Sequence, residues 1–97
     1  MALAPDLQTI FESYDFDNAE KVVLRKYLAE EARQLDIEAD DGDANYAEAH
    51  ELYEKLDSKT KDFVEESNSY MTSWHYGTLD IVEALRDMLN ELERRLK

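Results

Sequence analysis

The chain of 97 residues has no cysteine, two glycines, one proline and one tryptophan. Without cysteine there is no disulfide framework, no thiolate metal site and no cysteine nucleophile. With so little glycine and proline, the chain is not a low-complexity linker, and it has no glycine-rich loop to cradle a phosphate. Its longest purely aliphatic run covers residues 22–24. That run is far too short to predict a membrane span.

Basic residues are also scarce, because eleven Lys and Arg stand against twenty-four Asp and Glu, which gives a formal net charge of -13. This balance disfavours direct binding to nucleic acid or to an anionic membrane, since both require a basic surface. The N-terminal residues have neither the basic nor the apolar region of a secretory signal, so we expect a cytoplasmic protein, in a host cytoplasm if the source is viral. The length predicts a single helical domain over residues 1–97.

Apolar residues recur at helical spacing, and strand-like alternation is nearly absent, which predicts an all-α fold. Pro5 is a good first residue for a short helix. Asp17 and Glu20 have the spacing of a capping box, which predicts a second helix from there to about Leu35. Residues 36–43 contain five acids and no helical stripe, and we expect a loop there.

Residues 44–76 contain neither glycine nor proline, and most of their apolar side chains follow one helical stripe. This pattern predicts one long central helix of about 50 Å. The alternative is a break near Asp57 and Ser58, with Ser58 as a new N-cap. Gly77 is expected to end the long helix, and residues 78–96 have the spacing of an amphipathic C-terminal helix. Together these segments predict a small bundle of about four helices.

Four large side chains lie near the end of the predicted long helix. Tyr70 and Trp74 belong to its apolar stripe, so we expect them in the core. Met71 and Tyr76 lie off that stripe and are better candidates for a surface contact.

The acids concentrate between Gln34 and Glu54, where eight carboxylates occur without a single base. Like charges at this density repel one another, which favours a compensating cation or basic partner. The simplest alternative is a solvated surface that only keeps the protein in solution. The predicted partner-binding residues are Asp36, Glu38, Asp40, Asp41, Asp43, Glu48, Glu51 and Glu54.

No arrangement of residues predicts catalysis. Carboxylates alternate from Asp36 as in an EF-hand, but that frame puts Asp41 where the loop needs glycine and Ala47 where it needs glutamate. Only an irregular, weak cation site is left as an alternative. The two histidines, His50 and His75, have neither zincin nor di-iron spacing, and no nucleophile elbow is present. We therefore predict no metal, no cofactor and no enzymatic activity.

Two functions fit this sequence. The first is a non-enzymatic acidic protein that binds the basic surface of a nucleic-acid-binding partner. Carboxylates three or four residues apart on a helix lie about 5–6 Å from one another, so they can imitate the phosphates of a nucleic acid strand. In composition the chain resembles small phage-encoded inhibitors of restriction and CRISPR systems, which are short, acidic, helical and free of cysteine. That resemblance implies an inhibitor that mimics DNA.

The alternative is a homodimeric structural or adaptor module whose acids serve only solubility. The C-terminal helix supports it, because its apolar residues repeat at intervals of three and four, as in a coiled coil. The same stripe is also what a helix needs to pack inside its own bundle. The predicted oligomer interface consists of Val82, Leu85, Leu89, Leu92 and Leu96.

Overall fold

A computed structural model describes residues 3–95, and these residues form five α-helices and no strand. The helices are α1 (Pro5–Glu12), α2 (Asn18–Asp40), α3 (Ala47–Glu54), α4 (Ser58–Ser73) and α5 (Thr78–Arg95). The prediction of a small all-α bundle is confirmed, although the described residues hold five helices and not about four. The Cα radius of gyration is 12.7 Å, close to the value of about 13 Å typical of a folded chain of about 100 residues.

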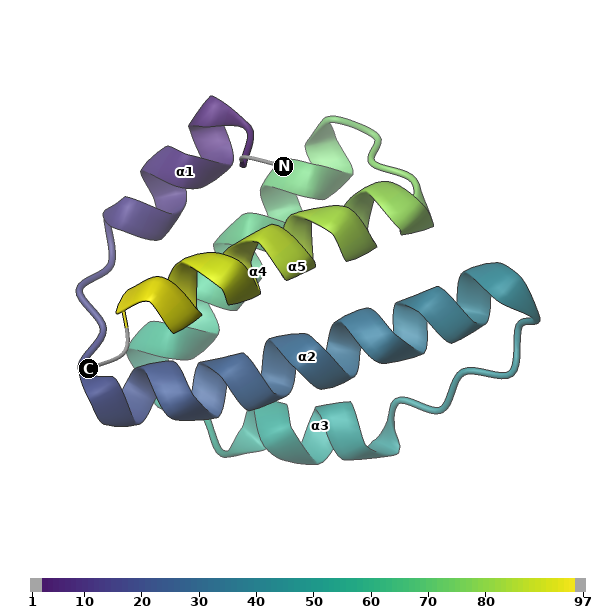
Figure 1. The fold of residues 1–97 in the computed structure, drawn as a ribbon, viewed down its shortest axis with the longest axis horizontal. Coiled ribbons are helices and arrows are strands. Elements are labelled where there is room, and N and C mark those ends of the chain that lie inside the picture. Colours follow the sequence, from purple (N-terminus) through teal and green to yellow (C-terminus); the bar gives the residue numbers. More distant parts are fainter. Residues whose placement is uncertain (1–2, 96–97) are drawn as a thin grey trace.

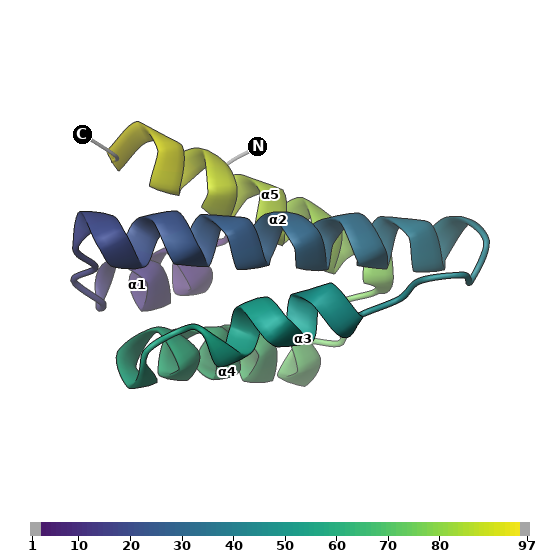
Figure 2. The same cartoon turned by 90° about the horizontal axis from the view of Figure 1, so that it is seen from below.

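The two longest helices, α2 and α5, run antiparallel and pack along most of their length (Figure 1). In both cartoon views, α2 lies between α5 on one side and α3 on the other (Figures 1 and 2). The short helix α1 packs on α4. Side chains from all five helices join in one buried cluster, so the bundle has a common core.

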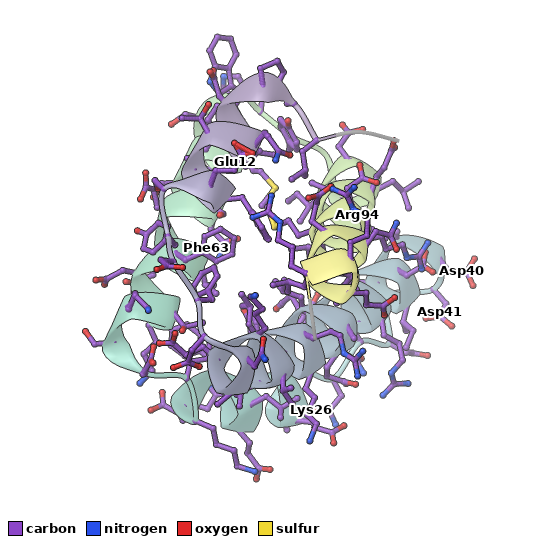
Figure 3. All side chains as sticks on the ribbon, turned by 60° about the vertical axis from the view of Figure 1, so that its left-hand side comes forward. Glu12, Lys26, Asp40, Asp41, Phe63 and Arg94 are labelled. Atoms are coloured by element: carbon purple, nitrogen blue, oxygen red, sulfur yellow. The ribbon has the colours of Figure 1, made fainter. Side chains whose placement is uncertain are left out.

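An aromatic group occupies the centre of that core (Figure 3). The ring of Phe63 is fully buried and meets three other rings edge to face. The centroid distances are 5.7 Å to Phe11, 5.5 Å to Tyr14 and 5.4 Å to Phe16. These rings come from α1 and from the turn that follows it, so Phe63 joins α4 to the N-terminal part of the chain.

The start of α2 is confirmed and its predicted end is wrong. Asp17 accepts a hydrogen bond from the Glu20 amide, and the Glu20 side chain accepts one from the Asp17 amide, which makes the predicted capping box. The helix continues through residues 36–40, which were expected to be a loop. Nothing in that segment breaks a helix, and the helix ends only near Gly42, whose φ of 81° is the left-handed conformation that glycine adopts readily.

The single long helix predicted over residues 44–76 is also wrong, because the chain forms α3 and α4 with a break between them. The alternative break was placed correctly, but Asp57 is the N-cap, not Ser58. One Asp57 oxygen accepts from both the amide and the hydroxyl of Thr60, at 2.9 and 2.7 Å. Such a side chain competes with the helical backbone and starts a new helix without glycine or proline. The break lets α3 pack on α2 while α4 packs on α1.

Candidate acidic interaction surface

The eight predicted partner-binding acids lie on one helical hairpin, formed by the C-terminal part of α2, the following loop and α3. We call residues 34–54 the acidic hairpin. Figure 2 shows α3 alongside the middle of α2, with the loop leading back to it from the end of α2 at one end of the bundle. Three of the acids are in the last turns of α2, two follow in the loop and three are on α3; in that order they are Asp36, Glu38, Asp40, Asp41, Asp43, Glu48, Glu51 and Glu54.

A buried amide, which sequence analysis missed, holds the hairpin together. The Gln34 side chain is 5% exposed, and its nitrogen donates to Glu30 at 2.7 Å. Its oxygen accepts from the backbone amide of Asn45 at 2.9 Å, and the Asn45 side chain in turn accepts from the Ala47 amide at 3.0 Å. These bonds fix the loop and the start of α3 relative to α2. The sequence indicates the burial of Gln34 only indirectly: it lies seven residues after Tyr27, and this spacing puts both side chains on the same face of the helix.

Part of the hairpin charge is already engaged within the chain. Asp36 pairs with Arg86 of α5 at 3.1 Å, and Glu54 lies 3.8 Å from Lys61. Two further carboxylates accept hydrogen bonds from polar groups that carry no charge: Glu38 from the Tyr46 hydroxyl, and Asp41 from the Asp43 amide. These contacts orient the acids but leave most of the negative charge uncompensated.

The remaining carboxylates face solvent. Within residues 3–95, the side chains of Asp40, Asp43 and Glu51 make no hydrogen bond or ion pair, and all three are exposed. Glu48 is exposed near Arg33, whose guanidinium pKa is raised chiefly by its hydrogen bonds to Glu30 and further by Glu48. Figure 3 shows Asp40 and Asp41 at the edge of the bundle, away from the core.

The carboxylates at the C-terminal end of α2 interact unfavourably with the dipole of that helix. Aligned peptide groups place partial negative charge at the C-terminal end of a helix, where cations are favoured and anions are not. The last turn of α2 has no basic residue, and it contains Asp40, with Asp41 as the C-cap. In α5 the arrangement is the usual one, with an acid in the first turn and Arg94 and Arg95 in the last. The end of α2 is therefore an electrostatically unfavourable site within the folded chain.

The predicted oligomer seam packs inside the bundle over its described part. Val82, Leu85 and Leu92 are each at most 3% exposed, and Leu89 is half-buried against the core. The last residue of the seam, Leu96, lies outside the described residues. The described part of the seam thus serves packing of the bundle and leaves little apolar surface for a second copy. Whether the chain dimerises stays a prediction.

At the end of α4, Trp74 and Met71 are arranged opposite to the expectation, whereas Tyr70 and Tyr76 are both half-buried against the core. Trp74 is 66% exposed, whereas Met71 is 1% exposed. Met71 follows the buried Ser67 by four residues on the core face of α4, whereas Trp74 is the C-cap and lies beyond the last residue of that helix. The helix ends before Gly77: His75 adopts the left-handed conformation at φ 57°, and the amides of His75 and Tyr76 bond back to Thr72 and Met71.

This end of α4 borders a cavity of about 430 Å³ between α1 and α5. Trp74 lines it together with Asp80 and Glu83 of α5. Tyr70 and Tyr76, which flank Trp74 in sequence, are half-buried, and their ring centroids lie 6.2 Å apart. The cavity thus brings carboxylates of α5 beside the exposed ring of Trp74.

A metal site, a membrane-spanning helix and similarity to known proteins would each bear on the function. In residues 3–95, no group of three or more histidine, aspartate or glutamate side chains converges to hold a metal ion. No helix among these residues combines the length and hydropathy needed to cross a membrane. The chain matches no known protein family, no curated protein and no solved structure at a significant level.

Proposed function

We propose that this chain is a non-enzymatic interaction protein whose acidic hairpin binds the basic surface of a partner protein. The observation that carries the proposal is the uncompensated charge at the end of α2. Carboxylates there act against the helix dipole, and Asp40, Asp43 and Glu51 have no cationic partner within the described residues. A lysine or arginine of a partner placed at this end would gain from the carboxylates and from the dipole together.

The hairpin suits a partner that normally binds nucleic acid. On α3, Glu48, Glu51 and Glu54 follow one another at intervals of three residues, a spacing that puts neighbouring side chains about 5–6 Å apart on a helix. The loop before α3 and the last turns of α2 carry the other five acids of the hairpin, and Figure 2 shows these segments at one end of the bundle. Gln34 fixes the loop and the start of α3 relative to α2, so binding requires little ordering of the hairpin backbone and loses less conformational entropy. We propose that the chain inhibits its partner by occupying the surface that would bind nucleic acid.

The test compares two triple variants that lose the same charge. The first removes three unpaired hairpin carboxylates with Asp40→Asn, Asp43→Asn and Glu51→Gln. The matched control removes three exposed carboxylates outside the hairpin with Asp15→Asn, Asp62→Asn and Glu83→Gln. Partners are captured from a cell extract on the wild-type chain, eluted with excess duplex DNA, identified and purified. Their dissociation constants are then measured for the three chains at several salt concentrations.

The proposal predicts that the hairpin variant loses at least tenfold in affinity at low salt and that the control variant loses much less. It also predicts that wild-type affinity falls as salt rises and that duplex DNA competes with the chain. Equal losses for the two triple variants would contradict the assignment of the hairpin. Partners that DNA does not displace would contradict mimicry of nucleic acid.

A further inference from the structure

A groove between α2 and α3 lies beside the acidic hairpin, and half of the residues that line it are tyrosines. Its volume is about 220 Å³. This is below the range of about 300–1,000 Å³ that is typical of small-molecule sites, so the groove suits a single side chain. Three tyrosines, one glutamate, one histidine and one alanine line it; they are Tyr27, Tyr46, Tyr53, Glu31, His50 and Ala49.

Glu31 is the acidic group of this groove, and no counterion for it is found among residues 3–95. Its side chain is half-buried and makes no hydrogen bond or ion pair within the described residues. The neighbouring acids Glu30 and Glu38 do have partners, in Arg33 with Gln34 and in Tyr46 respectively. Burial, together with the negative charges of Glu38 and Glu30, raises the pKa of Glu31. A carboxylate that loses part of its hydration without a partner is unusual in a folded protein and marks a place where a cation would fit.

The walls of the groove also favour a cation. The rings of Tyr27 and Tyr53 lie 5.8 Å apart between centroids and are tilted by 58°. The face of a tyrosine ring attracts cations, and the protein uses this already, since the Lys61 ammonium lies 5.4 Å from the centroid of Tyr53. The Tyr46 hydroxyl bonds to Glu38 and is therefore held at the groove.

We propose that this groove binds one arginine side chain of the basic partner, alongside the tyrosine side chains that line it and against the carboxylate of Glu31. A planar guanidinium can stack on an aromatic ring and at the same time bond to a carboxylate through two nitrogens, which an ammonium cannot do. This inference names the anchoring residue of the partner and in that respect rests on the proposed function. It adds a shaped site to an interface that otherwise depends on charge alone.

The experiment measures binding of an isolated arginine side chain by NMR. N-acetyl-arginine methylamide is titrated into the ¹⁵N-labelled protein, and the uncharged isostere N-acetyl-citrulline methylamide serves as the ligand control. The variants are Glu31→Gln, which removes the groove carboxylate, and Glu48→Gln, which removes one hairpin charge that does not line the groove. We expect saturable shifts at the amides of Glu31, His50 and Tyr53 with the arginine compound in the wild type and in Glu48→Gln. We expect these shifts to fall at least fivefold in Glu31→Gln and to be absent with the citrulline compound.

Three results would overturn the inference: equal shifts with citrulline, equal shifts in Glu31→Gln, or shifts spread over the hairpin acids instead of the groove. If the arginine compound fails while a captured partner still distinguishes the two triple variants, the groove assignment is wrong and the proposed function stands. If the arginine compound binds but no DNA-displaceable partner is found, the groove stands and the proposed function is wrong.

Discussion

Replacing Asp40 by asparagine should stabilise the protein, although Asp40 is exposed and the change removes no apolar contact. Asp40 is the last residue of α2, has no partner within the described residues and adds a negative charge at the negative end of the helix dipole. A charge in the final turn interacts with the dipole by about 0.3–1 kcal/mol at an exposed site in low salt. For a domain of this size, that corresponds to a rise of about 1–8 °C in melting temperature.

The control has to separate this local effect from the general repulsion in a chain of net charge -13. Asp62 is an exposed acid of α4, well before the C-terminal end of that helix, so Asp62→Asn changes the net charge equally without relieving an unfavourable dipole contact. Urea unfolding of both variants should be measured at about 10 mM and about 1 M salt, where the Debye length is about 30 Å and about 3 Å. Asp40→Asn should exceed Asp62→Asn at low salt, and the difference should shrink at high salt. Equal stabilities at low salt would refute the view that the end of α2 is electrostatically unfavourable.

Three further substitutions and one quenching measurement have defined outcomes. Phe63→Ala should lower the free energy of unfolding, measured with urea, by about 3–5 kcal/mol, because it removes a fully buried ring that touches three others. A loss of less than about 1 kcal/mol would show that this ring is not central to the core. Ser67→Ala should be neutral or stabilising by up to about 1 kcal/mol, since the buried Ser67 hydroxyl has no hydrogen-bond partner in the part of the chain that the structure describes; a loss of stability would reveal one. Glu31→Gln should stabilise the protein at pH 7, because the pKa of Glu31 is raised in the fold and its ionised form opposes folding. The advantage should disappear as pH falls below about 4.5, and a constant advantage would contradict that origin. The fluorescence of Trp74, the sole tryptophan, should be quenched more by caesium than by iodide at low salt, because Asp80 and Glu83 line the same cavity; equal quenching would contradict this surrounding charge.

Local patterns in the sequence predicted the parts of the fold that depend on neighbours in the chain. The capping box of Asp17 and Glu20 needs only residues three apart, and α5 follows a regular stripe that its own bundle covers. The break before α4 was ambiguous because no glycine or proline marks it, and because Asp57 and Ser58 are both good N-cap residues. One helix over residues 44–76 satisfied the same periodicity, and the Asp57 cap together with packing on two different neighbours, α2 and α1, accounts for the break.

The same limit applies to the candidate site. The set of acids between Gln34 and Glu54 could be predicted because these charges lie within a short stretch of the sequence, and the structure adds that three of the carboxylates lack partners within the described residues. The exposure of Trp74 could not be predicted, because α4 ends at Ser73 without a glycine or proline there and leaves Trp74 as its C-cap. The groove around Glu31 could not be predicted either, since it exists only where α3 packs on α2 and brings Tyr46 and Tyr53 opposite Tyr27.

The salt dependence of partner binding in the two triple variants tests the central claim most directly. Loss of Asp40, Asp43 and Glu51 should weaken binding at low salt and reduce the slope of log Kd against log salt concentration, because fewer ionic contacts form. Loss of Asp15, Asp62 and Glu83 removes the same charge and should leave that slope nearly unchanged. The same slope for both variants would show that the partner senses only the net charge, and the acidic hairpin would then have no specific role in binding.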